Sequence, residues 1–137
     1  MSDVIEFADG GFVHLGLGAT TVPLPRHTGE LSWYEQYGAD HGADGREGRL
    51  VSYHSFDRSW DTWEMHPVGS ELVLCVAGRV ELIQEATDGT TSTVAIGPGQ
   101  AVINEPGVWH TANVVDPDDP PTIVFITAGE GTEMRPR

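Results

Sequence analysis

Short segments rich in strand-forming residues follow one another along most of this chain, and glycine-rich and proline-rich turns separate them. Leu72–Val76 (LVLCV) is a continuous apolar run of the length expected for a buried strand, and Thr122–Thr127 (TIVFIT) predicts one more buried strand. The others are Arg49–Phe56, Val80–Ala86, Thr91–Ile96, Ala101–Asn104 and Trp109–Val115. Seven short strands without a long helical pattern predict an all-β sandwich or barrel, and a jelly roll closes such strands most economically.

The first third of the chain is less regular. A Gly-rich stretch, Gly29–Gly48, contains Trp33, Tyr34 and Tyr37 without a clean period. Two interpretations stay open for it: an edge strand with a surface loop packed by its aromatic side chains, or a flap over the barrel mouth. We expect one domain made of an N-terminal strand and loop segment packing on the barrel (1–48), the barrel itself (49–128) and a polar tail (129–137).

The amino-acid composition excludes several classes of binding partner and of reaction mechanism. The 137 residues include 21 acidic side chains and seven arginines but no lysine, which gives a net charge of −14. This balance argues against a nucleic-acid or anionic-membrane partner, and the missing lysine removes Schiff-base mechanisms. A single cysteine, Cys75, excludes internal disulfides and multi-cysteine metal sites. Met1–Gly10 has no apolar run, so we expect no signal peptide and a cytoplasmic location.

Candidate chemistry is concentrated in two segments. Glu64 and His66 are two residues apart and therefore share one face of an extended segment, and Glu71 opens the next apolar strand. His110 lies in the second segment, on the face of Ala112 and its apolar neighbours. Two imidazoles and one or two carboxylates would then converge inside one small barrel, a donor set that suits Fe, Mn, Ni, Co or Zn. A bound cation is also the simplest compensation for burying carboxylates.

These residues resemble the two motifs of the cupin family. The first motif is matched by Glu64-x-His66, four residues, Glu71, six residues and Gly78. The second is matched by Gly99, five residues, Glu105-Pro106-Gly107, two residues and His110, with Asn113 nearby. The resemblance covers most of Arg49–Thr127 and implies a small single-domain cupin, a double-stranded β-helix or jelly-roll barrel.

The sequence departs from the family pattern at four positions. Arg58 stands where the first motif begins with glycine, and Glu64 replaces that motif's first histidine. In the second motif, Glu105 replaces a proline and Asn113 lies one residue early.

Carried over residue by residue, the resemblance implies that His66, Glu71 and His110 are ligands of one divalent metal ion. Glu64 occupies the place of the family's fourth ligand with a carboxylate instead of an imidazole. Three roles stay open for Glu64: a ligand, a free general base beside the metal, or an ion-pair partner of Arg58 or Arg79.

The remaining candidate side chains have structural interpretations. We expect His54 to be structural, although its strand position also allows it to line the cavity, and we expect Cys75 to be a small buried side chain. The loop-like surroundings of the other histidines predict that they are solvated: His14, His27 and His41.

The resemblance implies a metalloenzyme of the oxygenase, isomerase or lyase type that acts on a small organic acid, sugar or phenolic. The alternative is a non-catalytic cupin that binds or senses a small ligand. We also predict a homodimer, because jelly rolls with exposed edge strands commonly pair them across a two-fold axis. The N-terminal segment before Arg49 is a candidate for exchange between subunits.

Overall fold

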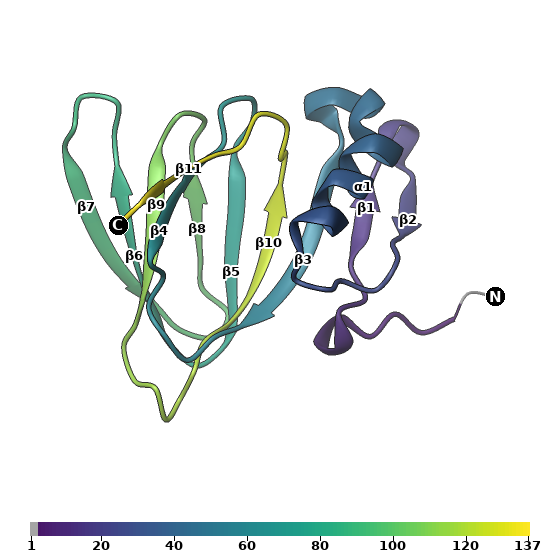
Figure 1. The fold of residues 1–137 in the computed structure, drawn as a ribbon. Helices are drawn as coiled ribbons and strands as arrows, with labels where there is room; N and C mark the ends of the chain where they lie inside the picture. The colour runs from purple at the N-terminus through teal and green to yellow at the C-terminus, as the bar shows by residue number, and fades with distance from the viewer. Residues whose placement is uncertain (1–2) are drawn as a thin grey trace.

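The computed structural model describes residues 3–137, which form two antiparallel sheets that face each other (Figure 1). The six-stranded sheet has the order β2 (Thr21–Pro23), β1 (Val13–Leu15), β3 (Arg49–Ser55), β10 (Thr122–Thr127), β5 (Glu71–Ala77), β8 (Ala101–Asn104). The five-stranded sheet has the order β11 (Glu133–Pro136), β4 (Thr62–Met65), β9 (Trp109–Val114), β6 (Val80–Glu85), β7 (Thr91–Ile96). The predicted all-β jelly roll is confirmed as a mostly β fold. Within residues 3–137, however, no strand pairing closes the two sheets into a barrel.

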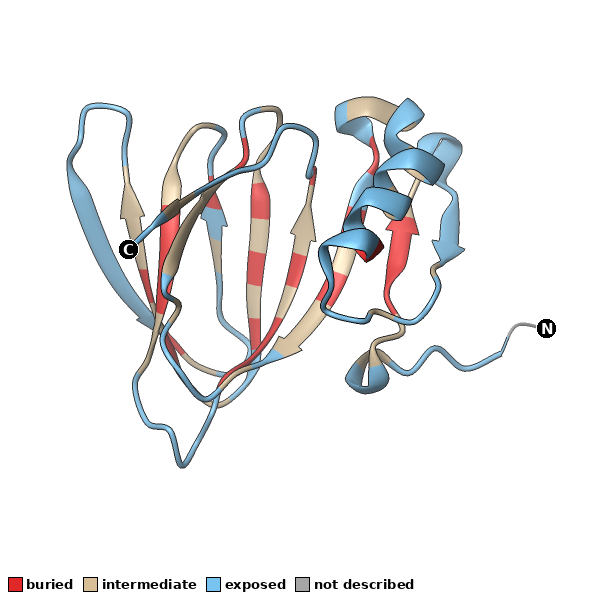
Figure 2. Ribbon diagram, in the orientation of Figure 1, coloured by how far each residue is buried: buried red, intermediate tan, exposed pale blue. Residues whose placement is uncertain are grey.

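The core lies between the two sheets because their strands alternate buried and more exposed residues, visible as red and tan bands on β5 and β10 (Figure 2). The side chains of the central layer come from both sheets: Val73, Cys75, Val80, Leu82, Ile96, Ala112, Ile123 and Phe125. Full burial of one such side chain contributes about 1.5–3 kcal/mol for the larger types. Cys75 is completely buried, as predicted.

The turn between β5 and β6 depends on a glycine. Gly78 has a φ of +68°, in the left-handed region, and a Cβ there would collide with the backbone carbonyl of Pro120. The close approach of the 116–121 loop to this hairpin therefore requires a residue without a side chain.

The Gly-rich stretch contains an α-helix, so the expectation of an edge strand and loop is wrong here. Helix α1 (Leu31–His41) continues into a 3-10 helix, η3 (Gly42–Glu47), and two shorter 3-10 helices precede it, η1 (Phe7–Asp9) and η2 (Leu17–Ala19). Trp33 and Tyr37 lie one helical turn apart, and their rings stack with centroids 5.9 Å apart. Trp33 is buried against Phe12 and Leu50, which attaches the helix to the six-stranded sheet.

His14 is buried, so the expectation that it is solvated is wrong. Its ring is 2% exposed, with Nδ1 2.6 Å from the Tyr37 hydroxyl and Nε2 2.7 Å from Asp44 Oδ2. The ring of His41 stacks on it at a centroid distance of 4.2 Å. His27 and His41 are each half-buried among aromatic rings rather than free in solvent. This network joins β1, α1 and η3.

The segment expected to be a polar tail contains strand β11, which pairs with β4. Arg135 holds it in place: its guanidinium lies over the rings of Trp63 and Trp109, at 5.1 and 4.5 Å, and forms a 2.6 Å ion pair with Glu85. The polar composition of this segment therefore gave no indication of a strand, because its side-chain contacts lie on the outer face of the sheet. Within residues 3–137, no helix has both the length and the apolar character needed to cross a membrane.

Candidate metal site

Strand register places a polar row on the inner face of the six-stranded sheet. Glu71 of β5 is paired with Thr127 of β10 on one side and with Asn104 of β8 on the other. The Thr127 hydroxyl donates a 2.6 Å hydrogen bond to Glu71 Oε2, and the Asn104 side-chain amide donates a 3.0 Å bond to Oε1. The buried Glu71 carboxylate is therefore fixed in one orientation.

A matching polar row lies on the inner face of the five-stranded sheet. His110 of β9 is paired with Glu64 of β4 and with Gln84 of β6. Gln84 connects the two rows, since its side-chain amide donates a 2.7 Å hydrogen bond to Asn104 Oδ1. His66 directly follows β4, and Gly107 N–H donates to its backbone carbonyl at 3.0 Å.

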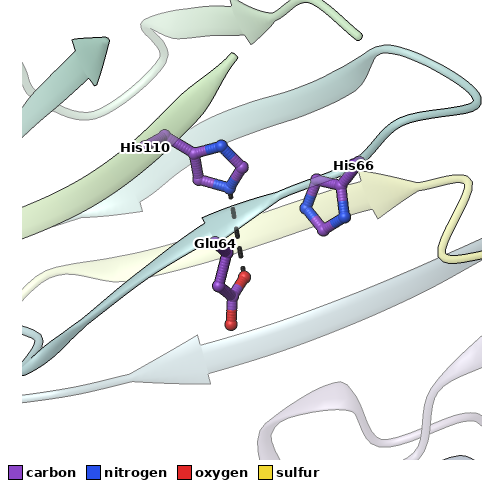
Figure 3. Close-up of side chains that lie close together, drawn as sticks. All are labelled: Glu64, His66 and His110. Carbon is purple, nitrogen blue, oxygen red and sulfur yellow. Dashed lines mark ion pairs between the residues drawn. The ribbon is translucent and has the colours of Figure 1, made fainter. Parts of the chain in front are cut away.

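All four candidate ligands that the sequence predicts converge between these two polar rows. His66 Nε2 lies 3.0 Å from Glu71 Oε2, and His110 Nε2 lies 3.3 Å from Glu71 Oε1. Glu64 Oε2 is 3.9 Å from His110 Nε2, the pair joined by the dashed line in Figure 3. The ligand atoms of Glu64, His66 and His110 all lie within 4.8 Å of one another.

Hydrogen bonds on the far side of each ring identify the atoms that face the site. The Thr132 hydroxyl donates to the Gly129 carbonyl at 2.9 Å, so it accepts the 2.8 Å bond from His66 Nδ1–H. His110 Nδ1–H donates to the Val108 carbonyl at 3.2 Å. In the neutral rings, both Nε2 atoms therefore present a lone pair to the site. Metal-binding histidines commonly have this arrangement.

The two Nε2 atoms are buried, and neither has a hydrogen-bond partner of acceptable geometry among residues 3–137. The oxygens of Glu71 lie 3.0 Å from Nε2 of His66 and 3.3 Å from Nε2 of His110, and these oxygens also carry lone pairs. An unsatisfied buried polar atom destabilises a fold by about 1–3 kcal/mol. A cation between these atoms would satisfy both nitrogens and compensate the carboxylate charge, so the residues present fit a divalent metal ion.

The two carboxylates differ in their electrostatic surroundings. Burial raises the pKa of Glu64, and the neighbouring charge of Glu71 raises it further. Burial also opposes ionisation of Glu71, but its interaction with His66 3.0 Å away, with the charge of His110 and the Thr127 hydrogen bond, outweighs burial and lowers the pKa of Glu71. Glu71 is therefore the more firmly ionised of the pair, whereas Glu64 accepts a proton more readily.

The two imidazoles also differ. Burial lowers the pKa of His66, but its interaction with the Glu71 carboxylate 3.0 Å away, with a contribution from Glu64, outweighs burial, and the net pKa is raised. Burial lowers the pKa of His110 more than Glu71 raises it. His110 is consequently the imidazole held more firmly in the neutral, ligating form.

Other candidate residues lie in different surroundings. Among the residues that the structure describes, no ion pair joins Glu64 to Arg58 or Arg79. The His54 ring packs near Phe12 and Phe125, at centroid distances of 5.3 and 5.9 Å. Burial, with a smaller contribution from His27, lowers the pKa of His54 to about 4.

The side chains that orient the candidate ligands were missed in the sequence. Asn104, Thr127 and Thr132 contact Glu71 or His66 directly, and Gln84 holds Asn104. The sequence contained a signal for two of them, because Asn104 and Thr127 are polar residues at the C-terminal ends of strands that are mainly apolar.

Comparison with known proteins identifies a fold and no closer relationship. No family model matches the sequence, and no curated protein matches it. An uncharacterised double-stranded β-helix protein from Klebsiella pneumoniae is similar in structure, with 20% identity, a TM-score of 0.53 and coverage of 65% of this chain and 76% of that one. Oxalate decarboxylase from Bacillus subtilis, solved in work on its Mn(II) centres, has 13% identity, a TM-score of 0.54 and coverage of 72% and 26%.

A third similar structure is Peruvianin-I, a cysteine peptidase from Thevetia peruviana latex, with 21% identity, a TM-score of 0.50 and coverage of 65% of this chain. This chain spans about half the length of Peruvianin-I (54%) and about a quarter of oxalate decarboxylase (26%). The shared architecture is the double-stranded β-helix, so this chain has the cupin fold that its motifs implied.

Proposed function

We propose that this cupin-fold chain binds one divalent metal ion through His66, His110, Glu71 and Glu64 and is a metalloenzyme for a small organic acid, sugar or phenolic. The observation that carries the proposal is the pair of buried Nε2 lone pairs that face carboxylate oxygens and have no hydrogen-bond partner among the described residues. The Mn(II) centres of the similar oxalate decarboxylase support the same chemistry on this fold. Fe, Mn, Ni, Co and Zn all suit the donor set.

Three of the four residues are held rigidly. Thr132 and the Val108 carbonyl orient His66 and His110, while Thr127 and Asn104 orient Glu71. When bound, the ion supplies a Lewis acid that polarises a carboxylate, carbonyl or hydroxyl oxygen of the substrate. The rigid residues hold their donor atoms in place before the substrate arrives, which limits the reorganisation that accompanies reaction.

Glu64 has a different role from Glu71. Its side chain is 29% exposed, against 4% for Glu71, and no hydrogen bond from the described residues anchors its carboxylate. Its raised pKa allows it to take up a proton more easily than an ordinary carboxylate. Glu64 therefore acts at the solvent side of the site, either as the displaceable fourth ligand or as the group that moves a proton to or from the substrate.

Metal content of protein purified without chelators tests the site. We expect about one equivalent in the native chain and a loss of most of it in His66→Ala and His110→Ala, because carboxylates alone hold borderline metals poorly. His41→Ala is the matched control, since His41 lies outside the site and should leave the metal content unchanged. Circular dichroism should show the same fold in all variants. Full occupancy in both site variants would place the ion elsewhere.

Activity is tested separately from binding. Catechols, diketones and keto acids are supplied to metal-loaded protein, and oxygen uptake and product formation are followed. Turnover that disappears in His110→Ala together with the metal supports a metalloenzyme. A protein that binds these compounds equally well without metal, and converts none of them, is instead a ligand-binding cupin.

A further inference from the structure

One arginine connects four consecutive strands on the outer face of the five-stranded sheet. Arg135 lies in β11, the edge strand beside β4 (Figure 1). The carbon of its guanidinium lies 5.1 Å from the ring centroid of Trp63 in β4 and 4.5 Å from that of Trp109 in β9. The same guanidinium forms a 2.6 Å ion pair with Glu85 of β6. We call these four residues the outer cluster.

The outer cluster lies directly behind the candidate metal site. Each residue that Arg135 contacts is the neighbour in sequence of a residue in the inner polar row of this sheet. The neighbours are Trp63 and Glu64, Trp109 and His110, and Glu85 and Gln84. Successive side chains of a strand point to opposite faces, so the outer cluster and the inner row occupy the same segments of the same three strands.

Backbone pairing alone holds β4 weakly against β9. Within residues 3–137 the two strands are in register at the single position Glu64–His110, whereas β6 pairs with β9 along its whole length. The Thr111 hydroxyl adds a 2.8 Å hydrogen bond to the Thr62 carbonyl across the same boundary. The position of Glu64 relative to His110 therefore depends on side-chain contacts between strands as well as on the backbone ladder.

The contacts of Arg135 are suited to fix this boundary. An isolated exposed ion pair holds its partners weakly, as expected for Arg26 and Asp9, whose side chains are 73% and 70% exposed. Arg135 and Glu85 are more buried, at 38% and 26%, and the guanidinium also lies over two indole rings. Cation–π contacts gain strength as they are withdrawn from water. Three simultaneous contacts therefore restrict the sliding of β4 against β9.

We propose that Arg135 is a positioning residue, which acts from the outer face to fix the spacing of β4 and β9 and thereby the place of the Glu64 carboxylate beside His110. It touches neither candidate ligand. The consequence for metal binding rests on the proposed function. Without Arg135 the ligands remain in the chain, but their donor atoms are no longer held within the roughly 0.5 Å that a preorganised site requires.

Titration with Co(II) alone tests the consequence for the site. Arg135→Met keeps an unbranched side chain over the tryptophans and removes the charge, so Co(II) affinity should fall about 10-fold or more. The visible spectrum of bound Co(II) should also change, because it reports the geometry of the ligands. Arg135→Lys should give an intermediate affinity, since an ammonium keeps the charge but lacks the flat guanidinium. Arg26→Met is the matched control and should leave affinity and spectrum unchanged.

Amide hydrogen exchange of the metal-free protein tests the positioning itself. In Arg135→Met we expect faster exchange than in the native chain along β4 and at the start of β9, because these strands separate more readily. Exchange in β5 and β10 of the other sheet should be unchanged. This measurement does not depend on whether the protein binds a metal.

Each outcome decides the proposal. Weaker Co(II) binding, an altered spectrum and faster exchange in β4 support it, with partial recovery in Arg135→Lys. Native affinity and spectrum in a merely less stable Arg135→Met overturn it, as does an equal loss in Arg26→Met. Unchanged exchange in β4 overturns it in every case. A native chain that binds no Co(II) refutes the proposed metal site, and the exchange comparison then decides the role of Arg135.

A milder variant keeps the test decisive if circular dichroism shows that Arg135→Met does not fold. Glu85→Gln removes the charge of one partner and leaves Arg135 over both tryptophans. The same changes in Co(II) affinity, spectrum and exchange are then expected at smaller size, and their absence overturns the proposal.

Discussion

The hydroxyl of Thr127 is the sharpest test of how Glu71 is held. Thr127→Val keeps the shape of the side chain and removes one 2.6 Å hydrogen bond to the buried Glu71 carboxylate. Hydrogen bonds to charged groups contribute about 1.5–3 kcal/mol. We therefore expect the free energy of unfolding of the metal-free protein to fall by about 1.5–3 kcal/mol, which corresponds to a decrease of about 5–10 °C in the thermal midpoint.

The same substitution should weaken metal binding. Loss of a group that orients a metal ligand typically reduces affinity about 10–100-fold, because the ligand must be fixed when the metal binds instead of beforehand. Metal affinity is measured by competition with a chelator of known affinity, and stability by urea unfolding of the metal-free protein. The two measurements separate an effect on folding from an effect on the site.

Thr122→Val is the matched control on the same strand. Its hydroxyl lies 2.6 Å from the Ser55 hydroxyl, so the substitution removes a neutral hydrogen bond away from the candidate metal site. It should lower stability by about 0.5–1.5 kcal/mol and leave metal affinity unchanged. If Thr127→Val matches the native protein in both stability and affinity, Thr127 does not orient Glu71, and the reasoning about this polar row is wrong.

Four further predictions test other parts of the structure. Glu64→Gln should reduce metal occupancy if Glu64 is a ligand, or should keep the metal and abolish turnover together with the acidic limb of the pH–rate profile if it moves a proton; unchanged metal and activity would leave it without a role. Tyr37→Phe should lower the free energy of unfolding by about 1–3 kcal/mol in a urea titration, because it leaves the buried Nδ1 of His14 without its partner, and an unchanged midpoint would contradict the network. Gly78→Ala should lower the free energy of unfolding by more than the roughly 1 kcal/mol that a left-handed conformation costs, because the new Cβ also meets Pro120. A smaller decrease, measured by thermal unfolding, would refute the close approach. In the folded protein the pKa of His54 is about 4, below its unfolded value of 6.5. Its contribution to stability is therefore complete above pH 6.5 and is lost as the pH falls towards 4. His54→Phe should flatten that part of a stability–pH profile, and an unchanged slope would count against a buried neutral ring.

Local patterning predicted seven of the eight strands between Arg49 and Thr127; the short strand β4 was expected only as an extended segment. The apolar run Leu72–Val76 and the segment Thr122–Thr127 became the adjacent central strands β5 and β10, because short apolar segments bounded by turn residues are typical of strands near the centre of a sheet. The spacing of the candidate residues in the sequence also predicted that they would lie close together between the sheets: Glu64, His66, Glu71 and His110. Side chains two apart share a strand face, and each candidate lies in or next to a strand whose register is set by apolar neighbours.

Tertiary contacts decided what local patterning left open. Helix α1 has glycine within it and little apolar periodicity, and it is held by packing of Trp33 and by the contacts of Tyr37 with a histidine far away in the sequence. Strand β11 likewise depends on Arg135 reaching two tryptophans and Glu85. Such contacts join residues many positions apart, so a pattern confined to neighbouring residues contains no record of them.

The environment of the candidate metal site shows the same division. Residue types and spacing indicated Glu64 and Glu71 as candidate donors, but the difference between them arises from pairing across strands. Glu71 lies between Asn104 and Thr127, which donate to its oxygens, whereas Glu64 is paired with His110 and lacks such donors among residues 3–137. The choice of candidate ligands follows from residue types and their spacing in the sequence. Their charge, order and proton affinity follow from neighbours supplied by other strands, because hydrogen bonding and desolvation act through space and not along the chain.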